Sequence, residues 1–465
     1  MTTDELVRQA GVLADGDNPD EAVAICDKIL INEPDNPGAL YVLGCVLLKA
    51  VRYVSAIQIA KRVCEVCPKD PRGWGLLALI YGEQNRYEES IRYAEKAVAC
   101  KRTDKTLADL AYAHCAAGNW DLSDRYGKEA LAEAQKNPSQ LASVAIQDAS
   151  VSQAYTRLAK GDWTEGFKGF RLTLRTKWRK ERQYGATPET VTKEWQGEPE
   201  AVVIVTGEQG LGDEIMAASV VPDAAMACNK FIFDCDHRLA ALFARSFPNV
   251  IVSPTRRESQ VRVPVMPTHH KSLFGLSELF RHKDADFPRT PYLIPNQEYV
   301  GMFRELFAGQ RMIGLAWSGG LPRTGETLRT AGLGAFLPLV RRGEAEFVSL
   351  QYKDDAAEVA EFERAHGVKI RRYPWVTQGP DMDLLAGLIA ACSEVVGVHT
   401  SALHLASALG VPTTVLTHRG SGWRYGPPEL LWYPPTTQMW RKQTGESWRD
   451  CVGRLVERRK GKLAA

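Results

Sequence analysis

The stretch AVVIVTGEQGLGDEIMAASVV, residues 201–221, decides how the rest of the chain is organised. Its apolar, β-branched beginning, residues 202–206, predicts a buried parallel strand, and a helix is predicted to begin near Asp213. Three glycines lie between them: Gly207, Gly210 and Gly212. A strand, a glycine turn and a helix N-terminus form an anion site, because free N–H groups and the helix dipole point outward there. A sharp turn that binds nothing is the alternative, since the glycine spacing matches neither the dinucleotide nor the phosphate-loop pattern.

Apolar strand-like runs alternate with helical segments after residue 200, which predicts parallel sheets covered by helices on both faces. We predict strands at residues 202–206, 230–234, 250–253, 312–317, 346–350, 368–371, 394–398 and 413–416. A short hinge at residues 307–310 divides the region into two α/β lobes, residues 200–306 and 307–444. Ligands of such folds bind at the carboxyl edges of the sheets, so we expect the site in the cleft between the lobes.

The residues before this region repeat with a period of 34, which is the period of tetratricopeptide repeats. Three sets of equivalent positions share the spacing: Ala22, Ala56 and Ser90; Leu13, Leu47 and Tyr81; Pro34 and Pro68. We predict three clear repeats and a weaker fourth at 105–136, in which Ala111, Tyr112 and Leu131 keep the register. Stacked helix pairs of this kind leave a concave groove that holds a peptide or protein. The alternative is that the array only supports the next domain or a dimer.

The predicted domains are therefore a repeat domain, a helical connector, two α/β lobes and a C-terminal helix with a basic tail. Their bounds are residues 1–137, 138–199, 200–306, 307–444 and 445–465. The connector boundary is placed where glycine, proline and threonine become frequent, at 184–199. The expected fold class is an α-solenoid followed by α/β lobes.

Composition excludes several classes of function. The chain has 465 residues, of which 45% are hydrophobic and 25% charged, as in an ordinary water-soluble protein. Lys plus Arg (58) nearly equals Asp plus Glu (56), so charge predicts neither a nucleic-acid nor a membrane partner. The N-terminal residues lack the apolar core of a signal peptide, and no apolar run approaches a membrane span. We expect a cytoplasmic protein whose ten cysteines are reduced.

The second lobe contains its own candidate anion site, in the stretch EVVGVHTSALHLASALGVP, residues 394–412. The predicted strand ends at His399, Thr400 and Ser401, and a helix follows. Two hydroxyls and free N–H groups at a helix N-terminus suit a phosphate or diphosphate. An ordinary helix N-cap is the alternative.

Several motifs now occur in one order along the chain. They are GEQGLGDEIM, W-x-G-E at 195–198, IGLAWSG at 313–319, FVSLQ at 347–351, H-T-S-x-x-H-L-A at 399–406, GWRYG at 422–426 and WYP at 432–434. Together with the repeats, they resemble bacterial tetratricopeptide-repeat glycosyltransferases whose catalytic part is similar to the ADP-heptose heptosyltransferases of glycosyltransferase family 9. The resemblance runs from the repeats to about residue 449.

The resemblance implies a GT-B fold with the acceptor on the first lobe and the nucleotide sugar mainly on the second. It also implies inversion at the anomeric carbon, with no metal and no cofactor beyond the donor. Helix N-termini and arginines can take the donor's phosphate charge in place of a metal. The partners expected are a nucleotide-sugar donor and a protein on the repeat groove, and the array is also compatible with a homo-oligomer.

Site residues follow from the resemblance position by position. Asp213 aligns with the family's glycine-loop aspartate, the base that takes the acceptor's proton, where Gly210 and Gly212 let a sugar approach. The residues implied to contact the donor are Ser318, Gly319, Arg323, Arg329, Gln351, Tyr352, Lys353, His399, Thr400, Ser401 and His404. Trp423 and Arg424 resemble a cleft-side loop, with plain packing as the alternative. His269 and His270 are candidates for an acid or base on a loop facing the cleft, with an exposed loop pair as the alternative.

One position departs from the family pattern, because His399 stands where an aspartate is common. A histidine cannot replace an ionised carboxylate as a hydrogen-bond acceptor, although it can bond a phosphate oxygen. The identity of the donor is therefore open. The leading hypothesis is a glycosyltransferase acting on a protein. The alternatives are an inactive repeat scaffold on the same fold and a heptosyltransferase-type enzyme that uses its repeats only for assembly.

Overall fold

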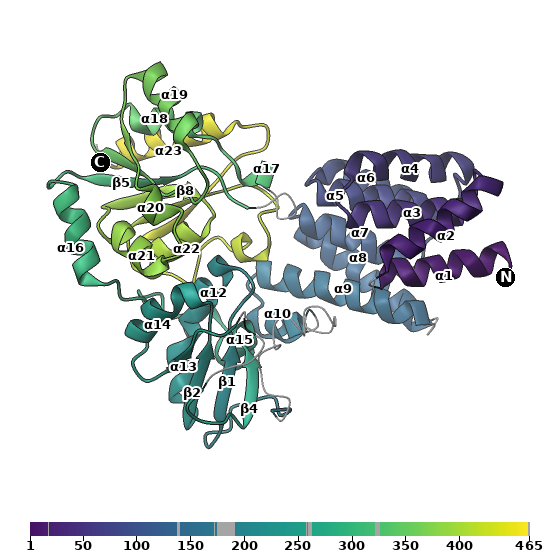
Figure 1. The fold of residues 1–465 in the computed structure, drawn as a ribbon, viewed down its shortest axis with the longest axis horizontal. Coiled ribbons are helices and arrows are strands. Elements are labelled where there is room, and N and C mark those ends of the chain that lie inside the picture. Colours follow the sequence, from purple (N-terminus) through teal and green to yellow (C-terminus); the bar gives the residue numbers. More distant parts are fainter. Residues whose placement is uncertain are drawn as a thin grey trace. The chain divides into compact units, whose positions relative to one another are not determined.

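The computed structural model describes residues 1–16, 18–136, 140–171, 173, 191–256, 258, 263–320 and 326–463. The chain divides into two compact units, Met1–Thr156 and Arg157–Ala465. The first unit is all helical, and the second contains two parallel sheets with helices around them (Figure 1). No described helix has both the length and the apolar character needed to span a bilayer.

The first unit consists of consecutive antiparallel helix pairs. Its helices are α1 (Thr3–Asp15), α2 (Pro19–Asn32), α3 (Pro37–Lys49), α4 (Tyr53–Val66), α5 (Pro71–Glu83), α6 (Tyr87–Cys100), α7 (Asp104–Ala116), α8 (Trp120–Lys136) and α9 (Gln140–Ala159). Ala22, Ala56 and Ser90 are almost fully buried where successive helices meet, as their common spacing predicts. Asn36 and Asp70 cap α3 and α5 by accepting hydrogen bonds from backbone N–H groups, and a proline follows each cap.

The connection between the third and fourth repeats, residues 101–103, is one residue shorter than the preceding connection, residues 67–70. In the second, third and fourth pairs the turn contains one residue with positive φ. These residues are Val51, Asn85 and Gly118, which are 34 and then 33 residues apart. Ala111 is buried as predicted, but Tyr112 is 44% exposed. The register through Tyr112 is therefore wrong, because the missing residue moves the buried tyrosine position of the repeat onto His114, which is 4% exposed.

Val51 has a backbone conformation that is unfavourable for valine. Its φ of 61° lies in the left-handed region, where a β-branched side chain is strained and asparagine is tolerated. We expect Val51→Asn to stabilise the repeat unit by about 1 kcal/mol, which raises its unfolding midpoint by roughly 2–4 °C. Thermal unfolding followed by circular dichroism measures the change. Val54→Asn, at an exposed position of α4, is the control and is expected to give no gain; equal behaviour of the two variants would contradict the strain argument.

Helix α9 contains the dividing point between the two units, so the predicted boundary at 137 is too early. Ala149 is buried against α7 and α8, and the hydroxyl of Thr156 donates to Ser123 at 2.9 Å. The C-terminal half of α9, which lies within the predicted connector, therefore packs on the last repeat. Leu158, two residues beyond the dividing point, packs on Gly166 of the second unit.

The first lobe is a four-stranded parallel sheet in the order β3-β2-β1-β4. Its strands are β1 (Val202–Thr206), β2 (Lys230–Asp234), β3 (Ile251–Ser253) and β4 (His269–Ser272). Its helices are α12 (Leu211–Ala217), η2 (Ala218–Val220), α13 (Val221–Met226), η3 (His237–Leu239), α14 (Ala240–Ser246), α15 (Leu273–Phe280) and η4 (Asp284–Asp286). Helix α12 begins two residues before Asp213, close to the prediction. Strand β4 was not predicted.

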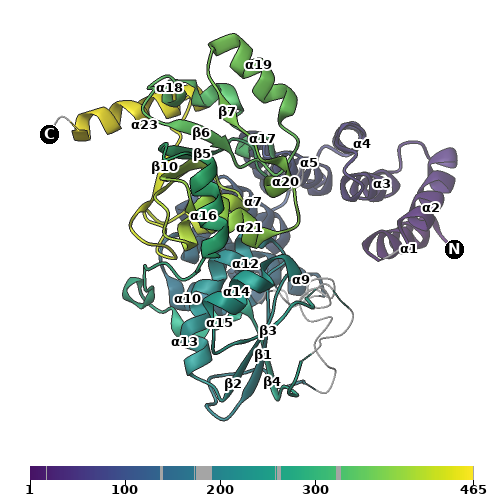
Figure 2. The ribbon, with the colours of Figure 1, turned by 60° about the vertical axis from the view of Figure 1, so that its left-hand side comes forward.

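The second lobe is a six-stranded parallel sheet in the order β7-β6-β5-β8-β9-β10. Figure 2 labels β5, β6, β7 and β10 of this sheet, with α18 and α23 beside them. Its strands are β5 (Met312–Ala316), β6 (Glu346–Ser349), β7 (Ile370–Arg371), β8 (Glu394–Val398), β9 (Thr413–Thr417) and β10 (Thr437–Arg441). Its helices are α16 (Gln297–Leu306), α17 (Glu326–Arg329), η6 (Leu333–Phe336), α18 (Leu337–Val340), α19 (Ala356–His366), α20 (Pro374–Thr377), α21 (Met382–Ala390), α22 (Ser401–Ala408), η7 (Trp423–Tyr425) and α23 (Trp448–Leu463). Counted along this lobe, the strand order is 3-2-1-4-5-6, the order of doubly wound nucleotide-binding sheets.

Two segments belong to the second lobe although the predicted boundaries exclude them. Helix α16 packs on α21, where a side chain at Gly387 would collide with Tyr299, so the chain crosses between lobes before Gln297 rather than at 307–310. Helix α23 was expected to be a separate tail. Its Val452 and Val456 are instead buried in the core of the second lobe.

Helix α10 (Trp163–Phe170) joins the two lobes through aromatic side chains. The Trp163 ring lies 4.9 Å from Phe287 and 5.8 Å from Trp432, and its Nε1 donates to Asp284 at 2.6 Å. Phe170 contacts Phe274 of the first lobe and Trp423 of the second. We call Trp163, Phe167, Phe170, Phe274, Phe287, Trp423 and Trp432 the aromatic seam.

Candidate functional site

Each lobe has one place where the strand order reverses, and ligands of open α/β sheets bind at the carboxyl ends of the strands there. In the first lobe the reversal lies between β1 and β4, so the glycine turn after β1 is at this point. In the second lobe it lies between β5 and β8, which are followed by Ser318-Gly319 and by His399-Thr400. The two predicted anion sites therefore occupy the two positions that topology favours for ligands.

The second-lobe edge contains buried polar atoms without a partner among the described residues. His399 is 5% and Thr400 is 6% exposed, and neither His399 Nε2 nor Thr400 Oγ1 has a hydrogen-bond partner there. Burial, together with the positive charges of Arg329 and Arg424, holds the pKa of His399 well below its usual range, so the ring is neutral. Unpaired buried polar groups are costly in a folded protein, which favours a ligand at this edge.

The loop after β5 is held against the same edge. A side chain at Gly319 would place its first carbon 2.6 Å from Thr400 Cγ2, so only glycine lets the two loops approach. The Ser318 hydroxyl lies 2.5 Å from the Gln351 amide, and an Arg329 Nη donates to the backbone oxygen of His399 at 2.6 Å. Two more predicted residues fix the surrounding loops: Tyr352 donates to the oxygen of Gly320 at 2.9 Å, and Lys353 pairs with Glu326. Arg323 lies outside the described residues, and Ser401 is the first residue of α22.

Asp213 contacts the second lobe directly. Its Oδ1 forms an ion pair with Arg424 Nε at 2.8 Å, and the two side chains are 37% and 24% exposed. The Arg424 guanidinium lies 4.7 Å from the Trp423 ring and 5.4 Å from the Phe274 ring. Trp423 is 4% exposed within the aromatic seam, so it packs and supports Arg424 instead of lining an open loop.

His404 connects the lobes, although the resemblance assigns it to the donor. A side chain at Gly212 would place its first carbon 2.8 Å from His404 Cδ2, so Gly212 allows α12 to approach α22. The two His404 ring nitrogens lie 2.5 Å from the Tyr433 hydroxyl and 2.9 Å from the Tyr425 hydroxyl. Both ring nitrogens of His404 therefore have protein partners in this arrangement. At the other glycine of the turn, Gly210, the first carbon of a side chain would lie 3.5 Å from Asp213 Oδ2.

Burial lowers the pKa of His404 to about 4, which makes the stability of the lobes depend on pH. Its usual value is 6.5, so below that pH the unfolded chain takes up a proton that the folded chain does not. The stabilisation is complete above pH 6.5 and decreases towards pH 4, by about 2 kcal/mol at pH 5. We expect His404→Gln to show a smaller loss of unfolding midpoint between pH 7 and pH 5. His237→Gln, with an exposed ring, is the control, and an unchanged pH dependence in His404→Gln would contradict the assignment.

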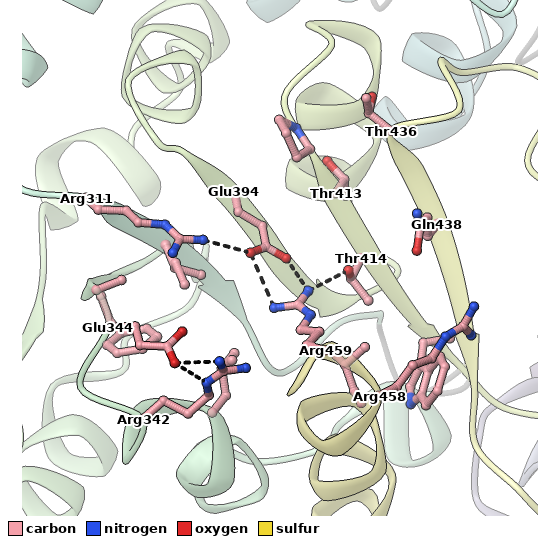
Figure 3. A pocket seen from close by; sticks show the side chains of 17 residues that line it. Arg311, Arg342, Glu344, Glu394, Thr413, Thr414, Thr436, Gln438, Arg458 and Arg459 are labelled. Atoms are coloured by element: carbon pink, nitrogen blue, oxygen red, sulfur yellow. Dashed lines mark hydrogen bonds and ion pairs between the residues drawn. The ribbon is translucent and has the colours of Figure 1, made fainter. Parts of the chain in front are cut away.

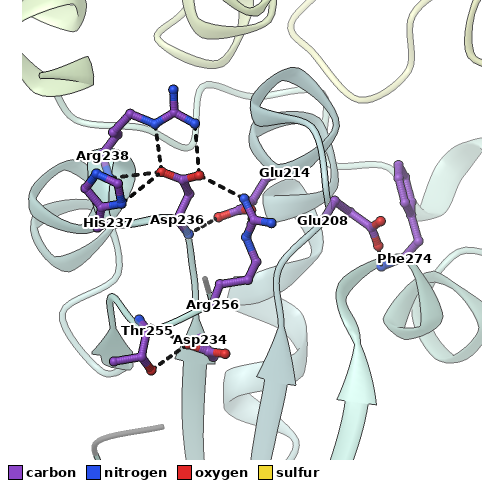
Figure 4. A network of polar contacts seen from close by, with 9 residues as sticks. All are labelled: Glu208, Glu214, Asp234, Asp236, His237, Arg238, Thr255, Arg256 and Phe274. Atoms are coloured by element: carbon purple, nitrogen blue, oxygen red, sulfur yellow. Dashed lines mark hydrogen bonds and ion pairs between the residues drawn. The ribbon is translucent and has the colours of Figure 1, made fainter. Parts of the chain in front are cut away.

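A buried charged network lies next to the glycine turn, and the sequence analysis did not predict it (Figure 4). Glu214 accepts from the Asp236 backbone N–H at 2.7 Å and pairs with Arg256 Nε at 2.8 Å. Arg256 also pairs with Asp236 at 2.9 Å, and the Arg238 guanidinium binds the same carboxylate through two nitrogens. Burial raises the pKa of Glu214, an effect that Arg256 counteracts. Any side chain at Gly207 would lie 2.7 Å from the Glu214 carboxylate, which explains this glycine without a ligand.

The assignment of His269 and His270 to a loop facing the cleft is wrong. Both lie at the amino end of β4, where they pair with Val203 and Ile204 of β1. The carboxyl end of this strand, which faces the cleft, is Ser272, so the histidines lie towards the opposite edge of the sheet. His269 Nδ1 lies 2.8 Å from the Thr268 hydroxyl, and we do not retain either histidine as an acid or base.

A cavity of about 420 Å³ lies at the amino edge of the second-lobe sheet, opposite His399 (Figure 3). Three of its arginines contact acidic groups: Arg459 and Arg311 reach Glu394, and Arg342 pairs with Glu344. Parallel sheets bind ligands at the carboxyl ends of their strands, and this cavity lies at the amino ends. We therefore interpret these ion pairs as structural.

Two further polar residues of the glycine turn were not singled out from the sequence. Glu208 is buried and accepts from the Phe274 backbone N–H at 3.1 Å, which ties the turn to α15. Gln209 has a buried side-chain nitrogen without a partner among the described residues. Their position directly after a buried strand is the signal that could have identified them.

Comparisons with known proteins give one family model and one curated relative. The model of a family described as anaphase-promoting complex, cyclosome, subunit 3 matches residues 15–97. Protein FlbA of Caulobacter vibrioides is 25% identical over 451 residues, which cover 90% of this chain and 72% of that protein.

Solved structures are similar at lower identity. The ADP-heptose lipopolysaccharide heptosyltransferase II of E. coli is 15% identical with a TM-score of 0.39, covering 56% of this chain and 99% of that one. A glycosyl transferase family 9 protein of Veillonella parvula is 13% identical with a TM-score of 0.38, covering 53% and 87%. A TPR protein of Thermus thermophilus is 18% identical with a TM-score of 0.33, covering 38% and 93%.

Two observations define the architecture of the chain. The N-terminal helices form pairs with a 34-residue period, and each of the two parallel sheets has its own reversal of strand order. The chain combines a tetratricopeptide-type helical array with two α/β lobes, each built on a parallel sheet.

Proposed function

We propose that this protein is a glycosyltransferase that moves a sugar from a nucleotide-sugar donor to an acceptor hydroxyl. The observation that carries the proposal is the pairing of two edges across one cleft. One edge has the unpartnered His399 Nε2 and Thr400 Oγ1 beside Arg329, and the other has the carboxylate of Asp213. A cationic, hydrogen-bonding edge suits the donor's phosphate, and an opposing carboxylate suits the removal of a proton.

In the proposed mechanism, the donor's phosphate binds to His399, Thr400 and Arg329. The side chain of Asp213 accepts the proton of the acceptor hydroxyl as that oxygen attacks the anomeric carbon. Attack from the face opposite the phosphate inverts this carbon, and the phosphate leaves with the bonding electron pair. The arginines at the cleft balance the leaving group's charge, so the proposal requires no metal.

We further propose that the acceptor is a protein held by the repeat array. Arrays of helix pairs present an extended groove, and such grooves commonly bind peptides and proteins. The family model that matches residues 15–97 supports the repeat assignment on which this step depends.

Nucleotide binding tests the proposal directly. UDP, GDP, ADP, CMP and sugar conjugates of each are titrated calorimetrically against the wild type and Thr400→Val, which removes an unpartnered hydroxyl while keeping the side chain's shape. We expect at least one nucleotide to bind, and to bind several-fold more weakly to Thr400→Val. Gln438→Ala at the amino-edge cavity is the control, with unchanged binding expected. Absence of binding by the wild type would refute the enzyme proposal and favour the inactive scaffold.

A further inference from the structure

We propose that Arg424 exchanges partners during the reaction, leaving Asp213 when the donor's phosphate arrives and so freeing this carboxylate to act as the base. This inference rests on the proposed function and assigns Arg424 a role that couples the donor site to the acceptor site. In the state described here, Arg424 Nε and Asp213 Oδ1 are paired at 2.8 Å. An oxygen that is paired with a guanidinium at this distance is not free to accept the hydrogen bond of an incoming hydroxyl.

The pair has the character of an exchangeable contact. Its side chains are 24% and 37% exposed, whereas the structural pair of Arg256 and Glu214 has side chains that are 4% and 0% exposed. Ion pairs that remain accessible to water contribute little to stability, so separating Arg424 from Asp213 costs little. A buried pair cannot be separated without leaving an uncompensated charge.

Arg424 lies next to a residue that contacts the donor edge. The ring of Tyr425, the following residue, is 4.6 Å from the His399 ring, and its hydroxyl lies 2.9 Å from His404 Nε2. Trp423 and Phe274 flank the guanidinium and keep it at the cleft whichever anion it binds. A phosphate bound at His399 and Thr400 offers Arg424 a charge-assisted bond that replaces the one with Asp213.

The exchange predicts an order of events. While the cleft is empty, Arg424 holds Asp213 and the base is occupied. When the donor binds, the phosphate takes Arg424, and Asp213 becomes available for the acceptor hydroxyl. No covalent bond forms or breaks in this step, since the only change is the anion with which the guanidinium forms an ion pair. The donor therefore binds productively before the acceptor.

A double-mutant cycle on nucleotide binding tests the exchange. The titrated probes are UDP, GDP, ADP and CMP, and the proteins are wild type, Asp213→Asn, Arg424→Gln and the double variant. We expect Asp213→Asn to bind the nucleotide roughly two- to fivefold more tightly, because Arg424 has no carboxylate to leave. Arg424→Gln is expected to bind about tenfold more weakly. In the double variant, the gain from Asp213→Asn is expected to disappear, since no guanidinium remains to be released.

The cycle separates partner exchange from simple charge repulsion. If the gain persists in the Arg424→Gln background, Asp213 merely repels the phosphate, and the exchange is refuted. If Asp213→Asn binds no more tightly than wild type, Arg424 stays with Asp213 in the complex, and the exchange is again refuted while the proposed function stands. Asp223→Asn, whose partner is Arg281 at 2.7 Å, is the matched control and is expected to bind as wild type does. Failure of wild type to bind any of the four nucleotides would overturn the exchange and the proposed function together.

Discussion

Replacing Asp213 with asparagine is expected to lower the rate of sugar transfer by roughly 10²–10⁴-fold, the usual contribution of a positioned general base. Asparagine has the same shape and can hydrogen-bond, but its amide cannot take a proton at neutral pH. Because the ion pair with Arg424 is lost at the same time, donor binding is expected to become tighter. The expected signature is therefore a fall in kcat without a rise in the donor's KM.

Initial rates of sugar transfer from a nucleotide sugar to a protein acceptor measure this effect. Titration with the donor measures binding separately. Asp223→Asn removes a carboxylate from another arginine pair of the first lobe and is expected to transfer as wild type does. Transfer by Asp213→Asn within tenfold of the wild-type rate would exclude Asp213 as the base.

Replacing Arg256 with methionine is expected to destabilise the second unit by about 3–5 kcal/mol, because it leaves Glu214 and Asp236 buried without their shared cation. The Arg256 side chain is 4% exposed, and both carboxylates are fully buried. Water cannot replace the lost charge, so the cost is that of an uncompensated buried anion. Thermal or urea unfolding of the full chain gives the measurement, with the repeat unit's transition as an internal reference.

Arg238→Met supplies a matched control on the same carboxylate. Arg238 also binds Asp236, but its side chain is 25% exposed, so its loss is expected to cost at most about 1 kcal/mol. Equal losses in the two variants would show that burial does not decide the strength of these pairs. A second variant, Arg256→Met combined with Glu214→Gln, is expected to recover part of the stability, since it also removes one of the stranded charges.

The two-lobed fold could be predicted from the sequence because its central strands are continuous apolar runs. Strands β1, β2 and β8 have the predicted bounds, and the other predicted strands differ from the observed ones by at most two residues at an end. The two strands that were missed, β4 and β10, are polar sequences at sheet edges, His-His-Lys-Ser and Thr-Gln-Met-Trp-Arg. Both sequences resemble loops because they are polar, and in β4 the polar groups are satisfied by contacts distant in sequence: Lys271 pairs with Glu194, and His270 bonds to the backbone of residues 193 and 195. The error in β4 also misplaced His269 and His270.

The candidate site was predictable only where its residues follow a strand directly. Thr400 and His399 were found because β8 precedes them, and parallel strands bring such residues to one edge. The contact between Asp213 and Arg424 joins residues far apart in the chain and depends on how two separate sheets face each other. No local pattern encodes that. The network of Arg256 was also missed, because Glu214 and Asp236 are distant from it in sequence. In the sequence alone, a single arginine in a polar segment resembles any surface residue.

The aromatic seam has a consequence for how the chain can be cut or rearranged. Helix α10 precedes both sheets in the sequence, yet Trp163 and Phe170 contact aromatic rings of each lobe. A truncated chain beginning at residue 200 would leave Trp423, Phe274 and Trp432 without this cover, and an open aromatic face of that kind promotes aggregation. Exchange of the repeat array for another, by recombination or in the laboratory, is therefore compatible with a folded enzyme only if the junction lies before Trp163.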